Sequence, residues 1–337
     1  SQRKVAGLLL ALTVLDLYSI EKRYWMFSPP ASTLYASDPA IAYLRAQEEP
    51  GRVISWSFGR AVGRDVMLDG DGLMVHRLRL ALGYHGNELG RYQRLGGKSQ
   101  ETGYNPRIIF SAPFWRHENV RFLYTDADEA AMKQIAAAVG TEVPAKVIGP
   151  VQDASGSSVY LYRLPGDNPF AWTAPVFVKA PDDQTLATVL DPRFDPTRVA
   201  IVDTGASVTA QAIQALPAPL GIDVRTTHYA PGEIDLALSS PAPAQAAVVV
   251  SENYFPGWAA TVDGRPAPLV RAEYNLMAVQ VPGGAKHIRL RFDDHAYQVG
   301  KVVSIVVVIA SLGLIVVGVL VERRRSSGAL GDAPDTP

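Results

Sequence analysis

Two stretches of this sequence carry side chains suited to holding an anion and a flat ring. The first, GYHGNELGRY, places Tyr84 and His85 in a glycine-rich segment and Arg91 and Tyr92 on the helix expected to follow it. An arginine grips phosphate through its planar, charged fork, and a tyrosine ring can stack on the face of a sugar. This stretch is a candidate binding site. The alternative is a loop held by hydrogen bonds between its own polar residues.

The second stretch, SENYFPGW, surrounds a Pro-Gly turn with aromatic residues and is followed by Arg271 in the segment RAEYN. We expect Trp258 to pack within a sheet and Tyr254 to be more exposed. Arg271 has the fork that suits a phosphate. The alternative reading is that Tyr254 and Trp258 only complete a core and that Arg271 is a surface charge.

Motifs for other chemistries are weaker. VDTGAS resembles an aspartic-protease motif around Asp203, but that mechanism needs a second aspartate to share a proton, and no second motif follows. LDGDGL at 68–73 lacks the further ligands of a calcium loop and predicts a turn. The residues therefore leave the catalytic residue unknown and predict no metal site and no cofactor.

Composition limits the classes of protein to which the chain can belong. The 337 residues carry a formal net charge of −1, which gives no field for nucleic acid, so we expect no nucleic-acid partner. The chain has no cysteine, which excludes a disulfide framework. Its length is enough for two or three compact units.

Apolar runs near both ends predict two transmembrane helices. Residues 302–321 are uncharged and long enough to cross a bilayer, and the arginines at 323–325 favour a cytoplasmic C-terminus. Residues 5–20 are shorter and contain Asp16, which fits either a span or the apolar part of a signal peptide. We favour a span. Because the chain begins at Ser1, we also expect it to be part of a longer protein.

Between the two spans the chain changes character. Helix and strand patterns mix in its first part, with a helix start at SDPA and a strand followed by a helix over 118–140. From about residue 222, short strands separated by turns predict an antiparallel, β-sandwich-like domain, including an Asp263-Gly264 hairpin. The expected fold class is α+β. The expected parts are a span and interface (1–27), a mixed α/β domain (28–221), an antiparallel β domain (222–299), a second span (300–322) and a cytoplasmic tail (323–337).

The stretch SENYFPGWAATVDGRPAPLVRAEYNLMAVQVPGGAKHIRLRFDDHAYQVGKVVS resembles the C-terminal signature of the YfhO-type family of bacterial polytopic membrane proteins. LGYHGNELGRYQRL at 82–95 and ENVRFLYT at 118–125 are similar to earlier motifs of that family. Together these matches cover most of residues 75–305.

The resemblance implies the C-terminal part of a multi-pass protein of the bacterial cytoplasmic membrane, similar to GT-C glycosyltransferases. Such enzymes transfer a sugar from a polyprenyl-phosphate carrier to a cell-envelope glycopolymer, so membrane lipid, the lipid-linked sugar and the polymer are the implied partners. The family's catalytic carboxylate is expected upstream of this chain, and the main domain on the outer face. The alternative function is a non-catalytic module that binds carbohydrate or polymer. A membrane-anchored aspartic protease is the third.

Overall fold

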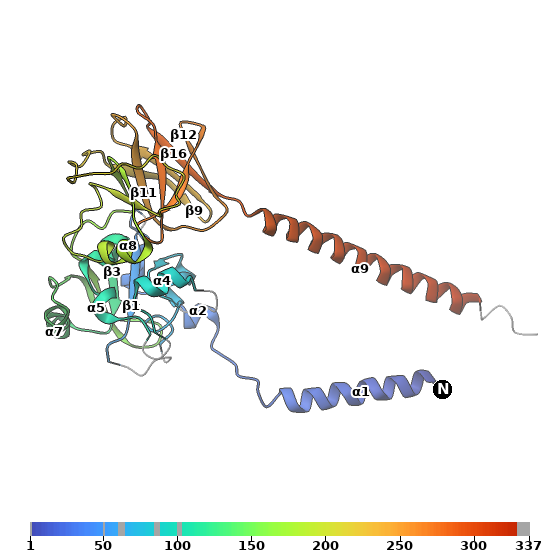
Figure 1. The fold of residues 1–337 in the computed structure, drawn as a ribbon. Helices are drawn as coiled ribbons and strands as arrows, with labels where there is room; N and C mark the ends of the chain where they lie inside the picture. Colours follow the sequence, from blue (N-terminus) through green and yellow to red (C-terminus); the bar gives the residue numbers. More distant parts are fainter. Residues whose placement is uncertain (1, 50, 60–64, 84–87, 100–102, 329–337) are drawn as a thin grey trace, which may run out of the picture. The chain divides into compact units, whose positions relative to one another are not determined.

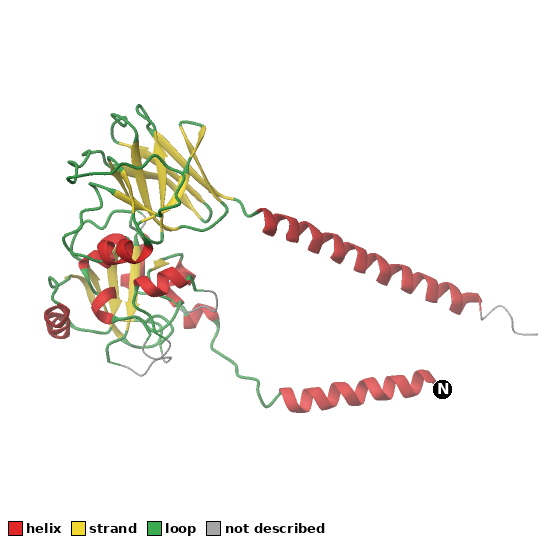
Figure 2. Ribbon diagram, in the orientation of Figure 1, coloured by secondary structure: helices red, strands yellow, loops and turns green. Residues whose placement is uncertain are grey.

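The computed structural model describes residues 2–49, 51–59, 65–83, 88–99 and 103–328 (Figure 1). The chain folds into two compact units, Ser1–Phe170 with Leu190–Pro192, and Ala171–Val189 with Arg193–Pro337. Helices and strands are mixed in the first unit, whereas strands dominate the second (Figure 2). The chain is therefore an α+β protein with several antiparallel strand pairs, as expected.

The first unit is built on a five-stranded sheet in the order β2-β1-β3-β5-β4. Strand β1 runs parallel to β2 and β3, while β5 is antiparallel to both β3 and β4. The bounds of these strands are β1 Arg52–Trp56, β2 Arg79–Leu80, β3 Val120–Thr125, β4 Ala145–Gln152 and β5 Ser158–Arg163.

Short helices surround this sheet, and local sequence sets where they begin. Asp38 accepts a hydrogen bond from the Ile41 N–H at 2.8 Å, and Pro39 occupies the first turn, so the predicted start of α3 is confirmed. The bounds are α1 Gln2–Glu21, α2 Ala31–Leu34, α3 Pro39–Arg45, η1 Gly72–His76, α4 Gly90–Leu95, α5 Pro106–Ile109, α6 Ala112–His117 and α7 Glu129–Val139.

Both faces of the first sheet are covered by apolar side chains. Phe122 and Val159 lie on one face and pack against Ile41 of α3. Leu123 points to the other face, where it lines a pocket with residues of α7. Because successive strand residues point to opposite faces, an almost continuous apolar run such as β3 is what a sheet buried on both sides requires.

The second unit contains two sheets, ordered β13-β12-β16-β10-β9 and β6-β11-β15-β14-β8-β7. All strand pairs are antiparallel except β7 with β8, which is parallel. The bounds are β6 Ala171–Ala174, β7 Phe177–Lys179, α8 Asp182–Val189, β8 Ala200–Val202, β9 Val224–Ala230, β10 Glu233–Leu238, β11 Ala246–Asn253, β12 Trp258–Val262, β13 Arg265–Ala267, β14 Leu269–Ala272, β15 Leu276–Val281, β16 His287–Phe292 and α9 His295–Gly328.

The predicted boundary at residues 221/222 is not where the compact units divide. Strand β6 pairs with β11, and β8 pairs with β14, so residues 171–202 contribute strands to a sheet of the second unit. These pairings join segments that are far apart in sequence. Local patterns cannot reveal them, because a strand's pairing partner leaves no mark on its own periodicity.

Five strands expected after residue 222 are present, together with three that the patterns did not reveal. The predicted Asp263-Gly264 turn is confirmed, because both residues have positive φ, 48° and 79°, and Val262 pairs with Arg265 across it. The three additional strands are β9, β13 and β14. Strand β9 is mostly exposed and so lacks the apolar alternation that marks a half-buried strand.

Among the described residues, one helix, His295–Arg323 within α9, is long and apolar enough to cross a membrane, and none of its apolar stretch is buried by protein. The segment predicted as the first span also forms a helix, α1, whose apolar side chains are exposed. Its apolar stretch is less suited to crossing a membrane than that of α9, and a second span is not established.

Candidate functional site

The turn between β14 and β15 in the second unit has the most unusual backbone near a predicted binding residue. Glu273 and Tyr274 follow β14 with φ of 47° and 77°, in the left-handed region that residues other than glycine rarely adopt. Both are buried, with 0% and 4% of their surface exposed. Two consecutive residues in this conformation persist only where the surrounding structure holds them, and such sites are often functional.

Glu273 is held by the end of β8. The Ile201 N–H donates to Glu273 Oε1 at 3.1 Å, and the Glu273 N–H donates to the Ile201 carbonyl at 2.8 Å. The β14–β8 ladder ends here, and the Glu273 carboxylate, in place of a backbone carbonyl, accepts the Ile201 N–H. The turn is fixed to its neighbouring strand, which keeps Arg271, two residues before Glu273, in a defined position.

Arg271 forms an ion pair with Asp203, the aspartate of the DTG motif, with a guanidinium nitrogen 2.6 Å from Asp203 Oδ2. The two residues are neighbours across the antiparallel β14–β8 pair. Their side chains keep 27% and 31% of their surface exposed, so an anion from solvent can reach the pair. Arg271 Nε is buried and has no hydrogen-bond partner among the described residues.

This pairing weakens the protease reading. The mechanism of an aspartic protease requires two carboxylates close enough to share a proton. The group that contacts Asp203 Oδ2 is instead the guanidinium of Arg271. An aspartate engaged by an arginine is arranged to orient that arginine, which fits a binding site better than a proton-sharing dyad.

Tyr254 lies beside the same turn. It follows β11, and its N–H donates to the Asn275 carbonyl at 2.7 Å. Asn275 in turn donates from its side chain to Asn253 Oδ1 at 2.9 Å. Tyr254 is half-buried, which is less exposed than expected. The structure therefore brings Tyr254 and Arg271 to neighbouring parts of one sheet, joined through the β14–β15 turn.

Trp258 belongs to the other sheet of this unit. It is half-buried at the start of β12, and its ring packs against Phe292 with the centroids 5.5 Å apart. The expected packing role of Trp258 thus has direct support, although it packs at a sheet edge and not in the fully buried core.

The other predicted group lies in the first unit. Tyr84 and His85 lie outside the described residues. Arg91 and Tyr92 are half-buried on α4, as the sequence placed them. The Tyr92 hydroxyl donates to the Ala81 carbonyl, and its ring meets Tyr104 edge to face at 6.5 Å. These contacts give Tyr92 a packing role that fixes α4 against the end of β2.

We expect Tyr92→Phe to lower the free energy of unfolding of the first unit by about 1 kcal/mol, because the Ala81 carbonyl loses its donor while the ring packing stays. This change is measured from hydrogen exchange of the β1 and β3 amides at increasing denaturant concentration. Tyr43→Phe is a suitable comparison, since it also removes one hydroxyl from a partly buried tyrosine of the same unit. A loss no larger than that of Tyr43→Phe would contradict the packing role of the Tyr92 hydroxyl.

A buried pair of carboxylates in the first unit was not anticipated from the sequence. Asp65 and Asp153 are 1% and 7% exposed. Ser157 donates its hydroxyl to Asp65 Oδ2 at 2.5 Å and its N–H to Asp153 Oδ1 at 2.8 Å, so one residue bridges the two acids. The pair is separated by 88 residues in sequence (153 minus 65), and no local pattern connects them.

The buried surroundings shift the pKa values of the two acids in opposite directions. Burial, together with the neighbouring Asp65 carboxyl group, raises the pKa of Asp153 to about 6. Burial alone would raise the pKa of Asp65, but hydrogen bonds from Asp153, Ser157 and the Met67 and Leu68 N–H groups outweigh it and lower that pKa. Shielding from solvent gives this pair a structural role, because a substrate cannot reach it.

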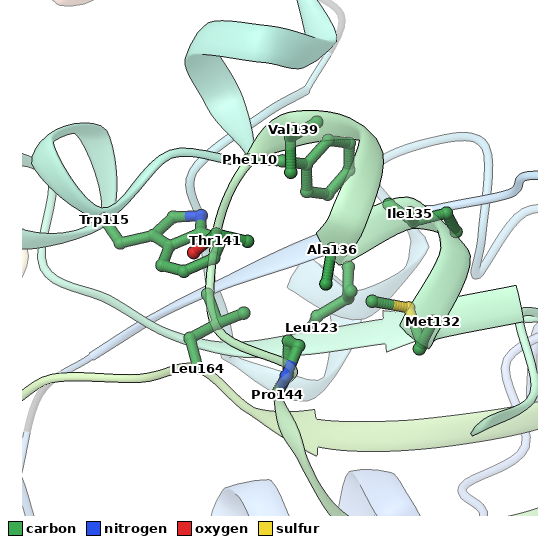
Figure 3. A pocket seen from close by; sticks show the side chains of 10 residues that line it. All are labelled: Phe110, Trp115, Leu123, Met132, Ile135, Ala136, Val139, Thr141, Pro144 and Leu164. Carbon is green, nitrogen blue, oxygen red and sulfur yellow. The ribbon is translucent and has the colours of Figure 1, made fainter. Parts of the chain in front are cut away.

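A small apolar pocket with a cavity volume of about 10 Å³ lies under α7 in the same unit (Figure 3). Its lining comes from α5–α7, β3 and the segments around Pro144 and Leu164: Phe110, Trp115, Leu123, Met132, Ile135, Ala136, Val139, Thr141, Pro144 and Leu164. Ligand pockets typically enclose roughly 300–1,000 Å³ and converge several polar groups. Thr141 supplies the one side-chain hydroxyl, so this pocket is a gap in packing.

In comparisons with known proteins, no family model, curated protein or solved structure matches the chain.

Proposed function

We propose that this chain is the extracytoplasmic part of a multi-pass membrane protein similar to GT-C glycosyltransferases. The longer protein transfers a sugar from a polyprenyl-phosphate carrier to a cell-envelope polymer. In this proposal α1 and α9 cross the bacterial cytoplasmic membrane, the two units lie outside, and the catalytic carboxylate comes from a preceding segment. The resemblance of residues 82–95 and 251–304 to the YfhO-type family supports the chemistry.

The observation that carries the proposal is that α9 has a long apolar stretch that no other part of the protein covers. Its apolar stretch is unburied and as long as a bilayer is thick. An apolar helix of this length in water would expose a large hydrophobic surface, which lipid removes from water. A sugar carried on a lipid must also be met at the membrane surface, and α9 keeps the second unit there.

Within the proposal, Arg271 is the group that binds the carrier phosphate. Its fork is partly exposed, is oriented by Asp203, and keeps a buried Nε with no hydrogen-bond partner among the described residues. Arginine is suited to phosphate because two parallel N–H groups bind two oxygens at once. Tyr254, whose backbone N–H is bonded to the same turn, is the aromatic residue assigned to this site with Arg271.

A non-catalytic module that binds carbohydrate or polymer is the second candidate. The ion pair favours it, because the carboxylate bonded to Arg271 is occupied by that guanidinium and not directed at a reacting group. The two candidates differ in whether loss of Arg271 changes the rate of sugar transfer or only the affinity for polymer.

Sugar transfer from a polyprenyl-phosphate donor tests the proposal. We expect the longer membrane protein to transfer sugar and residues 1–337 alone to be inactive, with no change caused by Asp203→Asn in the fragment. Turnover by the fragment would place catalysis within this chain. Peptide cleavage abolished by Asp203→Asn would establish the protease instead.

Membrane orientation can be tested with single cysteines, because the chain has none of its own. We expect an impermeant thiol reagent to label Ser99→Cys in intact cells and to label Ser327→Cys only after the membrane is opened. Ser99 lies in the first unit and Ser327 at the end of α9. Labelling of Ser327→Cys alone in intact cells would reverse the orientation.

A further inference from the structure

Three aromatic rings gather at one end of the second unit. Trp258 and Phe255 both pack against Phe292, with centroid separations of 5.5 and 6.3 Å. We call these three residues the aromatic cluster. Phe255 and Phe292 remain 44% and 38% exposed, so the rings pack on one another and still present an apolar surface outward.

The aromatic cluster is attached to the start of α9. Phe292 is the last residue of β16, and α9 begins at His295. The Asp293 N–H donates to the Gly257 carbonyl at 2.9 Å, so the Pro-Gly turn is bonded to the segment that leads into the helix. Gly257 has φ of 111°, which a side chain would strain, so this close approach depends on glycine.

The helix start sets how far the cluster can be from lipid. Asp294 caps α9, accepting from the Tyr297 N–H at 3.1 Å. At 1.5 Å per residue, Val302 is about 12 Å along the helix from Asp294. Headgroups occupy roughly 5–8 Å on each side of the hydrocarbon core. An upright helix that enters the hydrocarbon at Val302 therefore leaves the cluster roughly 4–7 Å beyond the headgroups, and a tilt of α9 toward the cluster closes this distance.

We propose that the aromatic cluster docks on the headgroup layer of the membrane that α9 crosses. Aromatic rings favour this layer because one side is apolar and the other is wet. The surface also carries Asp293 and the capping Asp294, which outnumber Lys301 of α9, so we assign zwitterionic lipid as the partner and not an anionic surface, which these carboxylates would repel. The inference rests on the proposed function only in that α9 spans the bilayer.

Spin labels on single cysteines test the docking in the full chain reconstituted in phosphatidylcholine vesicles. Pro256→Cys puts the label at the exposed tip of the turn and leaves all three rings in place. Arg265→Cys, exposed on β13 at the other end of β12, is the matched control, and Val308→Cys reports whether α9 lies in lipid. Collision rates with oxygen, which concentrates in lipid, are compared with those of a water-soluble nickel chelate.

We expect the oxygen-to-nickel ratio at residue 256 to exceed that at residue 265 several-fold, and Phe255→Ser combined with Pro256→Cys to bring it back toward the control. A water-like ratio at 256 with a lipid-like ratio at 308 would overturn the docking but not the span. Low collision with both reagents at 256 would mean that protein, including a second copy of the chain, covers the cluster, and would also overturn it. A water-like ratio at 308 would refute the span itself.

Discussion

Asp153→Asn is expected to stabilise the first unit by about 3 kcal/mol at pH 8 relative to the unchanged chain. The folded state holds a proton on Asp153 with a pKa of about 6, against an ordinary value of 3.8. The raised pKa favours folding at low pH, and that contribution is lost as the pH rises from about 4 through 6. Asparagine imitates the protonated acid, so it retains the contribution at all pH values.

The geometry explains why asparagine fits. Asp153 Oδ1 accepts the Ser155 and Ser157 N–H groups at 2.9 and 2.8 Å, and the asparagine carbonyl can accept both. Its amide then takes the position of Oδ2 and donates to Asp65. Asp38 and the Tyr124 hydroxyl, which bond to each other at 2.7 Å, are the other titratable groups beside the pair.

Hydrogen exchange of the β4 and β5 amides measures this effect in the first unit alone. The difference in free energy between variant and unchanged chain should be near zero at pH 4 and grow to its full value by pH 7. Asp65 acts in the opposite sense, because its lowered pKa gives stability that is lost as the pH falls below about 4. Asp128→Asn, an exposed aspartate that caps α7, is the control and should show no such growth. A flat difference between pH 4 and 8 would mean that the pKa of Asp153 is not raised in the folded state.

Arg271→Lys in the longer membrane protein is expected to abolish most polymer glycosylation while leaving folding and insertion unchanged. A partly exposed ion pair contributes about 1 kcal/mol or less, and lysine can still pair with Asp203, so stability should hardly change. Lysine keeps the charge and loses the planar fork, so two-point contact with phosphate is lost.

Arg265→Lys is the matched control, since it makes the same exchange at an exposed position on β13. Polymer glycosylation in cells and thermal unfolding of the purified proteins are compared for both variants. Glycosylation that is unchanged in Arg271→Lys would contradict the proposed phosphate-binding role and leave Arg271 as a structural partner of Asp203. A large loss of thermal stability would also contradict the proposal, because it would make the pair part of the fold.

The sequence by itself determined the features that depend on neighbouring residues. Asp38 and Pro39 begin α3, and Asp128 and Gly140 bound α7, because caps and left-handed turns act within a few residues. Asp263-Gly264 defined its hairpin for the same reason. The long apolar character of α9 follows from composition alone.

Only the tertiary structure decided what lies opposite each residue. It paired Asp203 with Arg271 and Asp65 with Asp153, and it placed β6 and β8 in the sheet of the second unit. These contacts join residues tens of positions apart, and their energy comes from burial and charge at positions that local patterns do not encode. For that reason the sequence could suggest an aspartate motif and a phosphate-binding arginine separately, while the fold showed that they form one pair.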